Sequence, residues 1–298
     1  MFEYTYINGK LFLSARAKIQ VTDRGFAFGD GVFETLRSYR GNIFMFSQHL
    51  DRLFGSLRAL RFNYGFNKEY VREAVEKTLR KNRLLASDAY IKIMVTRGEH
   101  TGDLSFSGKY NASLIIITKK LQVPPPVFYS RGVDLVSSTI KRIATRNPAH
   151  THKLMNYFEN LYAKNEALSK NAYEAFFLTA DKLVLEGAVT NIFLVRDRTV
   201  YTPSLSQNIL PGVTRSAVVD LCGENDIKIR EKNIHYRDLI DATEVFLTNS
   251  IIEILPVKKV DIHSIGGPVP GDITSRLLNL YRLGAGLYLY GKENSEFG

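Results

Sequence analysis

Lys119-Lys120-Leu121-Gln122-Val123-Pro124-Pro125-Pro126 divides the sequence into two parts. The run of prolines has no backbone N–H groups to donate, so we expect it to interrupt regular helix or sheet hydrogen bonding. We therefore interpret residues 121–128 as an interdomain linker. It leaves residues 1–120 as a smaller domain and residues 129–298 as a larger one. A chain of 298 residues is long enough for two domains.

Both parts mix strand and helix patterns without the strict alternation of a doubly wound sheet, which predicts an α+β fold. Before the linker we expect two hairpins, Tyr4–Ile7 with Leu11–Leu13 and Phe33–Tyr39 with Ile43–Phe46, helices at His49–Leu60 and Lys68–Lys81, and strands at Tyr90–Thr96 and Leu114–Thr118. After it we expect strands at Val133–Ser137, Ala175–Leu178, Leu183–Leu185, Ile192–Val195, Thr199–Tyr201 and Val245–Thr248, and helices at Asn156–Leu168, Val213–Cys222 and Thr274–Leu283.

The composition is that of an ordinary globular protein, with 45% hydrophobic and 23% charged residues. Cys222 is the single cysteine, which excludes an internal disulfide and favours a reducing compartment. The first ten residues do not have the pattern of a signal peptide. The longest aliphatic run, Leu114–Ile117, is far shorter than the roughly 20 residues of a membrane span. We expect a soluble cytoplasmic protein with no membrane partner.

The formal net charge of +10 raises the question of nucleic-acid binding. Basic residues are nevertheless mixed with acidic ones, as in residues 68–83, where the pattern indicates a solvated helix face. The sequence has no zinc-finger, basic-zipper or RNA-recognition signature. We therefore expect no nucleic-acid partner and interpret the charge as suited to a small anionic ligand. A basic binding protein without catalysis is the alternative from a different functional class.

Several catalytic and nucleotide-binding motifs fail on inspection. Gly29-Asp30-Gly31 opens like a dinucleotide fingerprint, but Glu34 stands where its third glycine belongs. Residues 286–292 have the spacing of a phosphate loop, but Glu293 replaces the required serine or threonine. The sequence contains neither a HExxH zinc motif nor a G-x-S-x-G nucleophile motif. We expect no metal site and no serine hydrolase chemistry.

Four separated elements fit a phosphorylated aldehyde cofactor. The first is His152-Lys153-Leu154-Met155-Asn156-Tyr157, which we place at the start of a helix. A lysine beside apolar surface can lose its charge by desolvation and become a nucleophilic amine. Tyr157 would lie one helical turn further on. Taken alone, such a lysine is more often an ordinary surface residue.

The second element is Leu185–Phe193, where Glu186 precedes Gly187 at a turn between two apolar strands. A carboxylate there would favour the protonated form of a heterocyclic nitrogen beside it. The third is Ile209–Arg215, where a Pro-Gly turn opens a helix and directs backbone N–H groups at an anion. The fourth is Thr248-Asn249-Ser250 at a strand end. Each element alone also fits an ordinary turn or helix start.

In this order the four elements resemble the class IV aminotransferases, which use pyridoxal 5′-phosphate on fold type IV. The resemblance covers nearly the whole chain, through Tyr6–Gly9, Phe28–Arg37, His49–Leu53, Lys153–Ala167, Glu186–Phe193, Ile209–Arg215, Phe246–Pro256 and Gly271–Leu277. It implies a fold like that of D-amino acid aminotransferase. Such a fold has a smaller N-terminal α/β domain and a larger C-terminal mixed β domain with flanking helices, with the active site between them.

The resemblance also assigns roles to individual residues. Lys153 would be the catalytic residue and would bond covalently to the cofactor aldehyde, while Glu186 would pair with the pyridine nitrogen. Tyr157 would bind the ring's phenolic oxygen. The phosphate would be held by Arg52, Val213, Thr214 and Ser250, with Asn249 as a nearby turn contact. The family forms homodimers, so we expect a second copy of the chain as the partner.

The implied reaction moves an amino group between an amino acid and a 2-oxo acid. The chain most resembles the branched-chain aminotransferases, through Phe33, Arg37, Tyr90 and the Lys153–Tyr157 segment. Their pattern of tyrosine, one residue and arginine appears here with Lys92 in place of arginine. Lysine keeps the charge but loses the two-pronged geometry that suits a carboxylate.

Two other branches of the family stay open. D-amino acid transaminases share Asp23–Gly25 and Phe28–Gly31 and use an Arg-x-His carboxylate trap, which is missing in its usual form from Arg97–Thr101. Arg97 or Arg37 would then have to bind the substrate carboxylate. The second is aminodeoxychorismate lyase, which releases 4-aminobenzoate and pyruvate and which this chain resembles at Phe33–Arg37. The candidate substrate-binding residues are Phe33, Arg37, Tyr90, Lys92 and Arg97.

Overall fold

The computed structural model describes the chain except residues 1–2, 100–101, 103, 107–109, 144–146 and 294–298, and the side chains of residues 287–293. The chain forms two compact units. Unit 1 comprises Met1–Gln122, His152–Tyr157 and Ala285–Gly298, and unit 2 comprises Val123–Thr151 and Phe158–Gly284. The chain therefore first leaves unit 1 within the stretch that we interpret as a linker, but the lysine segment groups with the N-terminal unit.

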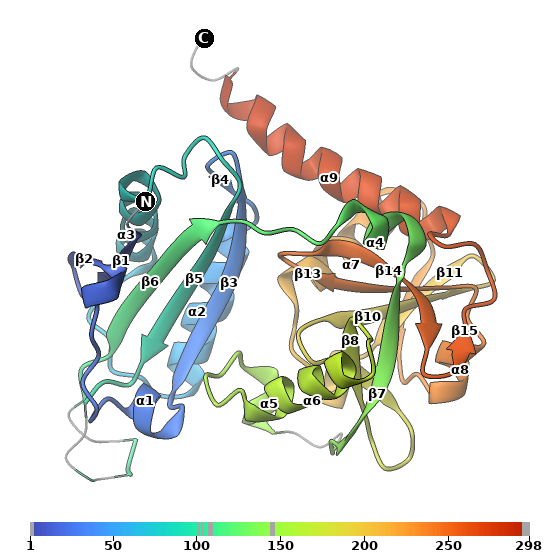
Figure 1. Cartoon of the computed structure of the whole chain (residues 1–298), viewed down its shortest axis with the longest axis horizontal. Coiled ribbons are helices and arrows are strands. Elements are labelled where there is room, and N and C mark those ends of the chain that lie inside the picture. The colour runs from blue at the N-terminus through green and yellow to red at the C-terminus, as the bar shows by residue number, and fades with distance from the viewer. Residues whose placement is uncertain (1–2, 100–101, 103, 107–109, 144–146, 294–298) are drawn as a thin grey trace. The chain divides into compact units, whose positions relative to one another are not determined.

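The described residues of unit 1 form a six-stranded sheet in the order β2-β1-β6-β5-β3-β4 (Figure 1). Its strands are β1 (Tyr4–Ile7), β2 (Lys10–Leu13), β3 (Gly31–Tyr39), β4 (Asn42–Ile43), β5 (Ala89–Thr96) and β6 (Ser113–Lys120). The neighbouring strands are antiparallel. The first predicted hairpin is confirmed, and so is the second, except that its second strand ends at Ile43 and Phe46 begins a helix. The first turn uses Asn8 and Gly9 in the left-handed region, at φ 44° and 91°.

One face of this sheet forms the core of unit 1 together with α2 (Phe46–Ala59) and α3 (Lys68–Lys81). Two further short helical segments of this part are η1 (Ser14–Arg16) and α1 (Arg24–Phe28). Alternation along β3 turns Val32 and Leu36 toward the helices, where both are fully buried. Glu34 lies between them on the same face, whereas Phe33 and Thr35 belong to the opposite face.

The lysine segment continues the edge of this sheet. Phe33 N–H donates to Lys153 O at 2.9 Å, and Met155 N–H donates to Gly31 O at 2.9 Å. Leu154 pairs antiparallel with Val32 between these two bonds. The helix α6 begins only at Phe158 and ends at Ser169. The prediction that Lys153 stands at the start of a helix is therefore wrong, because strand pairing to β3 takes this segment first.

The described residues of unit 2 form a nine-stranded sheet with the order β12-β11-β10-β13-β14-β7-β8-β9, and β15 pairs with β14. Its strands are β7 (Val133–Lys141), β8 (Glu174–Leu178), β9 (Val184–Gly187), β10 (Asn191–Arg196), β11 (Thr199–Pro203), β12 (Ile229–Lys232), β13 (Glu244–Asn249), β14 (Glu253–Val260) and β15 (His263–Ser264). Its helices include α4 (Pro126–Arg131), α5 (Pro148–Thr151), α6, η2 (Leu205–Gln207), α7 (Val213–Glu224) and α8 (Tyr236–Ile240), and α9 (Asp272–Glu293) begins in this unit.

Several elements of unit 2 escaped prediction, and β14 is the most instructive. Pro256 lies inside this strand opposite Phe246 of β13, although proline cannot donate to a sheet ladder. The pairing with β7 shifts register between Val257 and Lys259, so the missing donor falls next to a bulge. The prediction that the prolines exclude regular structure was also wrong at Pro126. This residue opens α4, where proline is favoured because no N–H is needed.

Among the helices of the described residues, none combines the length and the hydropathy that a membrane span requires.

Two glycines of unit 1 predict stability changes of opposite sign. Gly41 has φ +90°, and an added Cβ would lie 2.3 Å from Leu85 O. Gly55 lies within α2, and an added Cβ would meet nothing within 4 Å. We expect Gly41→Ala to destabilise the protein by about 1 kcal/mol or more. Gly55→Ala should stabilise it by about 0.5–1 kcal/mol, because alanine is the better helix former.

Urea unfolding at fixed cofactor concentration measures both changes. An unfolding midpoint for Gly41→Ala equal to that of the wild-type protein would contradict the strained turn.

Candidate active site

The Lys153 amine lies against two aromatic rings of unit 1. Its Nζ is 4.7 Å from the centroid of the Phe33 ring and 5.8 Å from that of the Tyr157 ring. The two rings meet edge to face, with centroids 5.3 Å apart. Because Lys153 pairs directly with Phe33 across the strand edge, the two side chains share a face. The structure thus brings together three of the residues predicted for the site.

Arg52 and His49 of α2 meet Glu34 of β3. Arg52 donates from Nε to Glu34 Oε1 and from Nη2 to Glu34 Oε2, both at 2.7 Å. His49 Nδ1 lies 2.7 Å from Glu34 Oε2. The exposed fractions of the side chains are 1% for Glu34, 2% for His49 and 13% for Arg52. We refer to these three residues as the Glu34 cluster.

The charges of the Glu34 cluster follow from its geometry. Burial alone would raise the pKa of Glu34, but Arg52 and His49 outweigh it and hold this pKa at about 2. Burial lowers the pKa of His49, against the opposing effect of Glu34. The positive charge of Lys153 also contributes to the lower pKa of His49, so the cluster and the lysine interact electrostatically.

Lys92, like Lys153, lies against the ring of Phe33. Its Nζ is 4.8 Å from the centroid of the Phe33 ring, and burial, followed by the charge of Lys119, lowers its pKa. Tyr90 lies two residues before Lys92 on β5, and burial raises the pKa of its hydroxyl. Lys92, Phe33 and Lys153 therefore form one group.

Arg37 lies further along β3 and is held by an acidic neighbour. Its Nη2 donates to Asp88 Oδ2 at 2.9 Å, and its guanidinium lies 4.2 Å from the centroid of the Tyr39 ring.

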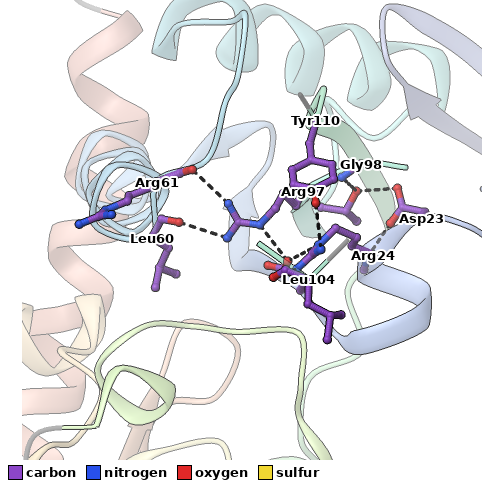
Figure 2. A network of polar contacts seen from close by, with 11 residues as sticks. Asp23, Arg24, Leu60, Arg61, Arg97, Gly98, Leu104 and Tyr110 are labelled. Carbon is purple, nitrogen blue, oxygen red and sulfur yellow. Dashed lines mark hydrogen bonds and ion pairs between the residues drawn. The ribbon is translucent and has the colours of Figure 1, made fainter. Parts of the chain in front are cut away.

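Arg97 lies in a separate network of polar contacts, shown in Figure 2. Its Nε donates to Asp30 Oδ2 at 2.8 Å, and its other two nitrogens donate to Arg61 O and Leu60 O at 3.0 and 3.1 Å. Its side chain is only 2% exposed, and Asp30 also binds Arg24. The structure therefore does not place Arg97 with the other candidate substrate-binding residues.

Glu186 of β9 lies in unit 2 and binds an arginine that the sequence analysis did not identify. Arg142 Nη1 donates to Glu186 Oε1 at 3.1 Å, and the backbone N–H of Leu210 donates to Oε2 at 3.0 Å. Arg142 also donates from Nε to Glu159 Oε2 and from Nη2 to Asn160 Oδ1, and the Phe177 ring centroid lies 3.5 Å from its guanidinium carbon. The paired arginine stabilises the negative charge of this buried carboxylate.

The start of α7 has the donors that an anion requires. Gly212 caps this helix without a side-chain hydrogen bond, so the cap residue leaves the first N–H groups, of Val213 and Thr214, available as donors. A Cβ on residue 212 would lie 2.0 Å from Asn191 Oδ1, so any residue larger than glycine would clash at this position. Asn191 in turn donates to Leu210 O at 3.1 Å and fixes the preceding loop.

The end of β13 adds hydroxyl groups in the same unit. Thr248 is 1% exposed, and its Oγ1 is among the buried polar atoms that have no hydrogen-bond partner within the described part of the chain. A buried hydroxyl of this kind has a donor to offer to a ligand oxygen. Asn249 instead shapes the turn, because its Oδ1 accepts from Ile251 and Ile252, each at 2.9 Å. Ser250 is half-buried within that turn.

The groups of unit 2 suit a phosphorylated pyridine. The helix start and the Thr248 hydroxyl are donors for phosphate oxygens, and Glu186 is an acceptor for a protonated ring nitrogen. In unit 1, Lys153 is an amine that could bond to an aldehyde. Sequence reasoning missed Glu34, His49 and Arg142. Only the place of Glu34 on the inward face of an apolar strand gave a signal, because a carboxylate there needs a partner.

Comparisons with known proteins agree with this chemistry. The family model described as amino-transferase class IV matches residues 31–260. A Methanocaldococcus jannaschii protein, named as a candidate branched-chain-amino-acid aminotransferase, is 36% identical over 93% of this chain and 94% of its own. A Bacillus subtilis aminodeoxychorismate lyase is 30% identical, with 93% of each chain covered. A Bacillus licheniformis D-alanine aminotransferase is 28% identical, covering 91% of this chain and 93% of its own.

Solved structures give the same result. The Escherichia coli branched-chain amino acid aminotransferase superposes with a TM-score of 0.87 at 28% identity, covering 93% of this chain and 92% of its own. The T.th. branched-chain amino acid aminotransferase with pyridoxamine 5′-phosphate gives a TM-score of 0.87 at 26% identity, covering 94% and 93%. With the family model matching most of its length, the chain belongs to the class IV aminotransferases and is a pyridoxal 5′-phosphate-dependent transferase of fold type IV.

Proposed function

We propose that the chain transfers amino groups between branched-chain L-amino acids and 2-oxo acids. The observation that carries this choice is the placement of Arg97, whose guanidinium is buried, binds Asp30, and donates to Leu60 and Arg61 (Figure 2 shows the last two). The D-amino acid alternative requires a carboxylate trap in this loop, and Arg97 was its first candidate. The second candidate, Arg37, is held by Asp88.

The comparisons support the same choice. The relative with 36% identity is named as a candidate branched-chain enzyme, and two branched-chain aminotransferase structures superpose at a TM-score of 0.87. The lyase and the D-alanine enzyme have 30% and 28% identity. The aromatic surface of Phe33 and Tyr157 beside the Lys153 amine also suits an apolar substrate side chain.

We assign the proton transfer to Lys153. Bound pyridoxal phosphate supplies an aldehyde that takes up the amino group and a ring that withdraws electrons from the substrate Cα. The Lys153 amine would remove the Cα proton as general base and, as general acid, deliver it to the carbon that carried the aldehyde, so that Cα becomes the carbonyl carbon of the 2-oxo acid. Glu186 keeps a proton on the ring nitrogen, and Arg142 keeps Glu186 in its charged form and in place. Tyr157 binds the phenolic oxygen of the ring.

Different residues bind the phosphate and the substrate. Val213 and Thr214 donate backbone N–H groups to the phosphate, and Ser250 and Arg52 contribute their side chains; Asn249 keeps the turn of Ser250 in shape. Lys92 and Tyr90 bind the substrate carboxylate. Lys92 is the favoured cation for this role because it lies on the same ring as Lys153, 4.8 Å from the Phe33 centroid.

The substrate assignment is tested by single-turnover reactions of the cofactor-loaded protein. We expect L-leucine to convert the cofactor to its aminated form, with loss of visible absorbance, and D-alanine to leave the spectrum unchanged. Lys92→Gln should raise the KM for L-leucine several-fold with a smaller effect on kcat, because it removes the carboxylate partner. Arg97→Gln is the matched control. It should lower stability and leave this KM within about twofold.

A response to D-alanine alone would contradict the proposal. If neither amino acid reacts and 4-amino-4-deoxychorismate yields pyruvate, the chain is a lyase instead.

We also propose that the chain forms a homodimer through α6. Phe158, Leu161, Tyr162 and Leu168 lie on one side of this helix and are 75%, 55%, 48% and 58% exposed. An exposed, largely apolar helix face of this kind, interrupted by the exposed Asn165, is typical of an interaction surface. A second copy of the chain is the occupant that the family resemblance implies.

Light scattering after size exclusion tests the dimer. We expect a dimer for the wild-type chain and a monomer for Leu161→Glu, because a charge would be buried in the interface. Ile262→Glu provides the matched control, because Ile262 is 83% exposed and lies outside this helix face. A wild-type monomer, or a Leu161→Glu dimer as stable as the wild type, would refute this interface.

A further inference from the structure

The Glu34 cluster contains a charge that the proposed reaction does not use. Glu34 neither supplies an amine nor lies among the groups assigned to the ring. Its carboxylate nevertheless accepts three hydrogen bonds, two from Arg52 and one at His49, all at 2.7 Å. A side chain that is 1% exposed and carries a full charge requires such partners to be tolerated.

Arg52 also depends on Glu34 for its orientation, because its side chain has several rotatable bonds and an exposed fraction of only 13%. Binding of Nε and Nη2 by both oxygens of one carboxylate fixes the plane of the guanidinium. A guanidinium fixed in advance loses less conformational freedom when it binds an anion. Glu34 itself is fixed by the backbone ladder of β3, where it lies opposite Ile93 of β5.

Two effects of Glu34 on a phosphate oppose one another. Its negative charge weakens the attraction between Arg52 and an anion, whereas its hydrogen bonds orient the guanidinium. In the absence of Glu34, the buried guanidinium would have to turn toward other acceptors. His49 stands beside it, but an imidazole is either neutral or positively charged and so cannot replace Glu34 as an anionic acceptor. Orientation should therefore outweigh repulsion.

We propose that Glu34 is a positioning residue for the cofactor phosphate, acting through Arg52. This inference rests on the role of Arg52 in phosphate binding that is part of the proposed function. Glu34 contacts neither cofactor nor substrate in this assignment. It holds the arginine on α2 at a fixed orientation relative to β3, the strand that also pairs with the Lys153 segment.

The experiment compares two ligands that differ only in the phosphate. The cofactor-free full chain is titrated with pyridoxal 5′-phosphate and with pyridoxal, following the visible absorbance of the bound aldehyde. For Glu34→Gln we expect the Kd for pyridoxal 5′-phosphate to rise about tenfold to a hundredfold, the range of a charge-assisted hydrogen bond. The Kd for pyridoxal should stay within about twofold of the wild-type value.

Glu253→Gln is the matched control. Glu253 is likewise buried, 3% exposed, and bound to an arginine, Arg282, at 2.7 Å. We expect this variant to lose stability without changing the ratio of the two Kd values. In the Arg52→Met background, Glu34→Gln should have little further effect on that ratio, because the group through which it acts is gone.

Three results would overturn the inference. An unchanged or lower Kd for pyridoxal 5′-phosphate would mean that Glu34 only screens Arg52. An equal loss for both ligands would mean a purely structural role. Additive effects of Glu34→Gln and Arg52→Met would mean that the two act separately. If Glu34→Gln does not fold, Glu34→Asp carries the same test, because the shorter carboxylate keeps the charge and cannot reach both guanidinium nitrogens.

The titration measures cofactor binding and does not involve turnover, so its outcome does not depend on which substrate the enzyme uses. Failure of the amino acid reactions with an intact difference between the two ligands would refute the substrate assignment alone. If the wild-type protein instead binds pyridoxal 5′-phosphate and pyridoxal with equal Kd values, the role of Arg52 in phosphate binding is refuted.

Discussion

The antiparallel pairing of the Lys153 segment with β3 is the interaction on which the unit 1 part of the site depends. Two backbone bonds of 2.9 Å, Phe33 N–H to Lys153 O and Met155 N–H to Gly31 O, fix the register of this segment. A shift by one residue would turn Lys153 to the opposite face and Leu154 away from the core. The aromatic surroundings of the amine are therefore a consequence of strand register, and α6 begins only after this pairing ends.

The same strand serves two purposes because its side chains alternate between faces. Phe33 lies beside the amine, and Glu34 on the other face binds Arg52 and His49 of α2. In unit 2, Glu186 is held in a comparable way by Arg142 and the Leu210 N–H. In both units a buried carboxylate is paired with an arginine, which is the condition under which a charge can be kept away from water.

Much of the fold was predictable from local pattern. The Asn8-Gly9 turn, the helix Lys68–Lys81 and the Pro-Gly start of α7 are confirmed, because each depends on nearby residues. The extended conformation at Lys153 and the strand containing Pro256 were not, because each is decided by a distant strand. The family and its cofactor could be predicted from motifs, whereas the ion pair of Arg142 and the burial of Arg97 depend on partners that no spacing reveals.

Trapping the cofactor on its lysine tests most directly whether this pairing presents the reactive amine. Lys153 and Lys92 both lie within 5 Å of the Phe33 ring centroid, at 4.7 and 4.8 Å, so the test separates two real candidates. The holoenzyme is reduced with borohydride, digested and mapped by mass spectrometry. We expect the phosphopyridoxyl group on Lys153 alone. Stoichiometric modification of Lys92 with Lys153 unmodified would contradict the assignment of the amine to the segment that pairs with β3.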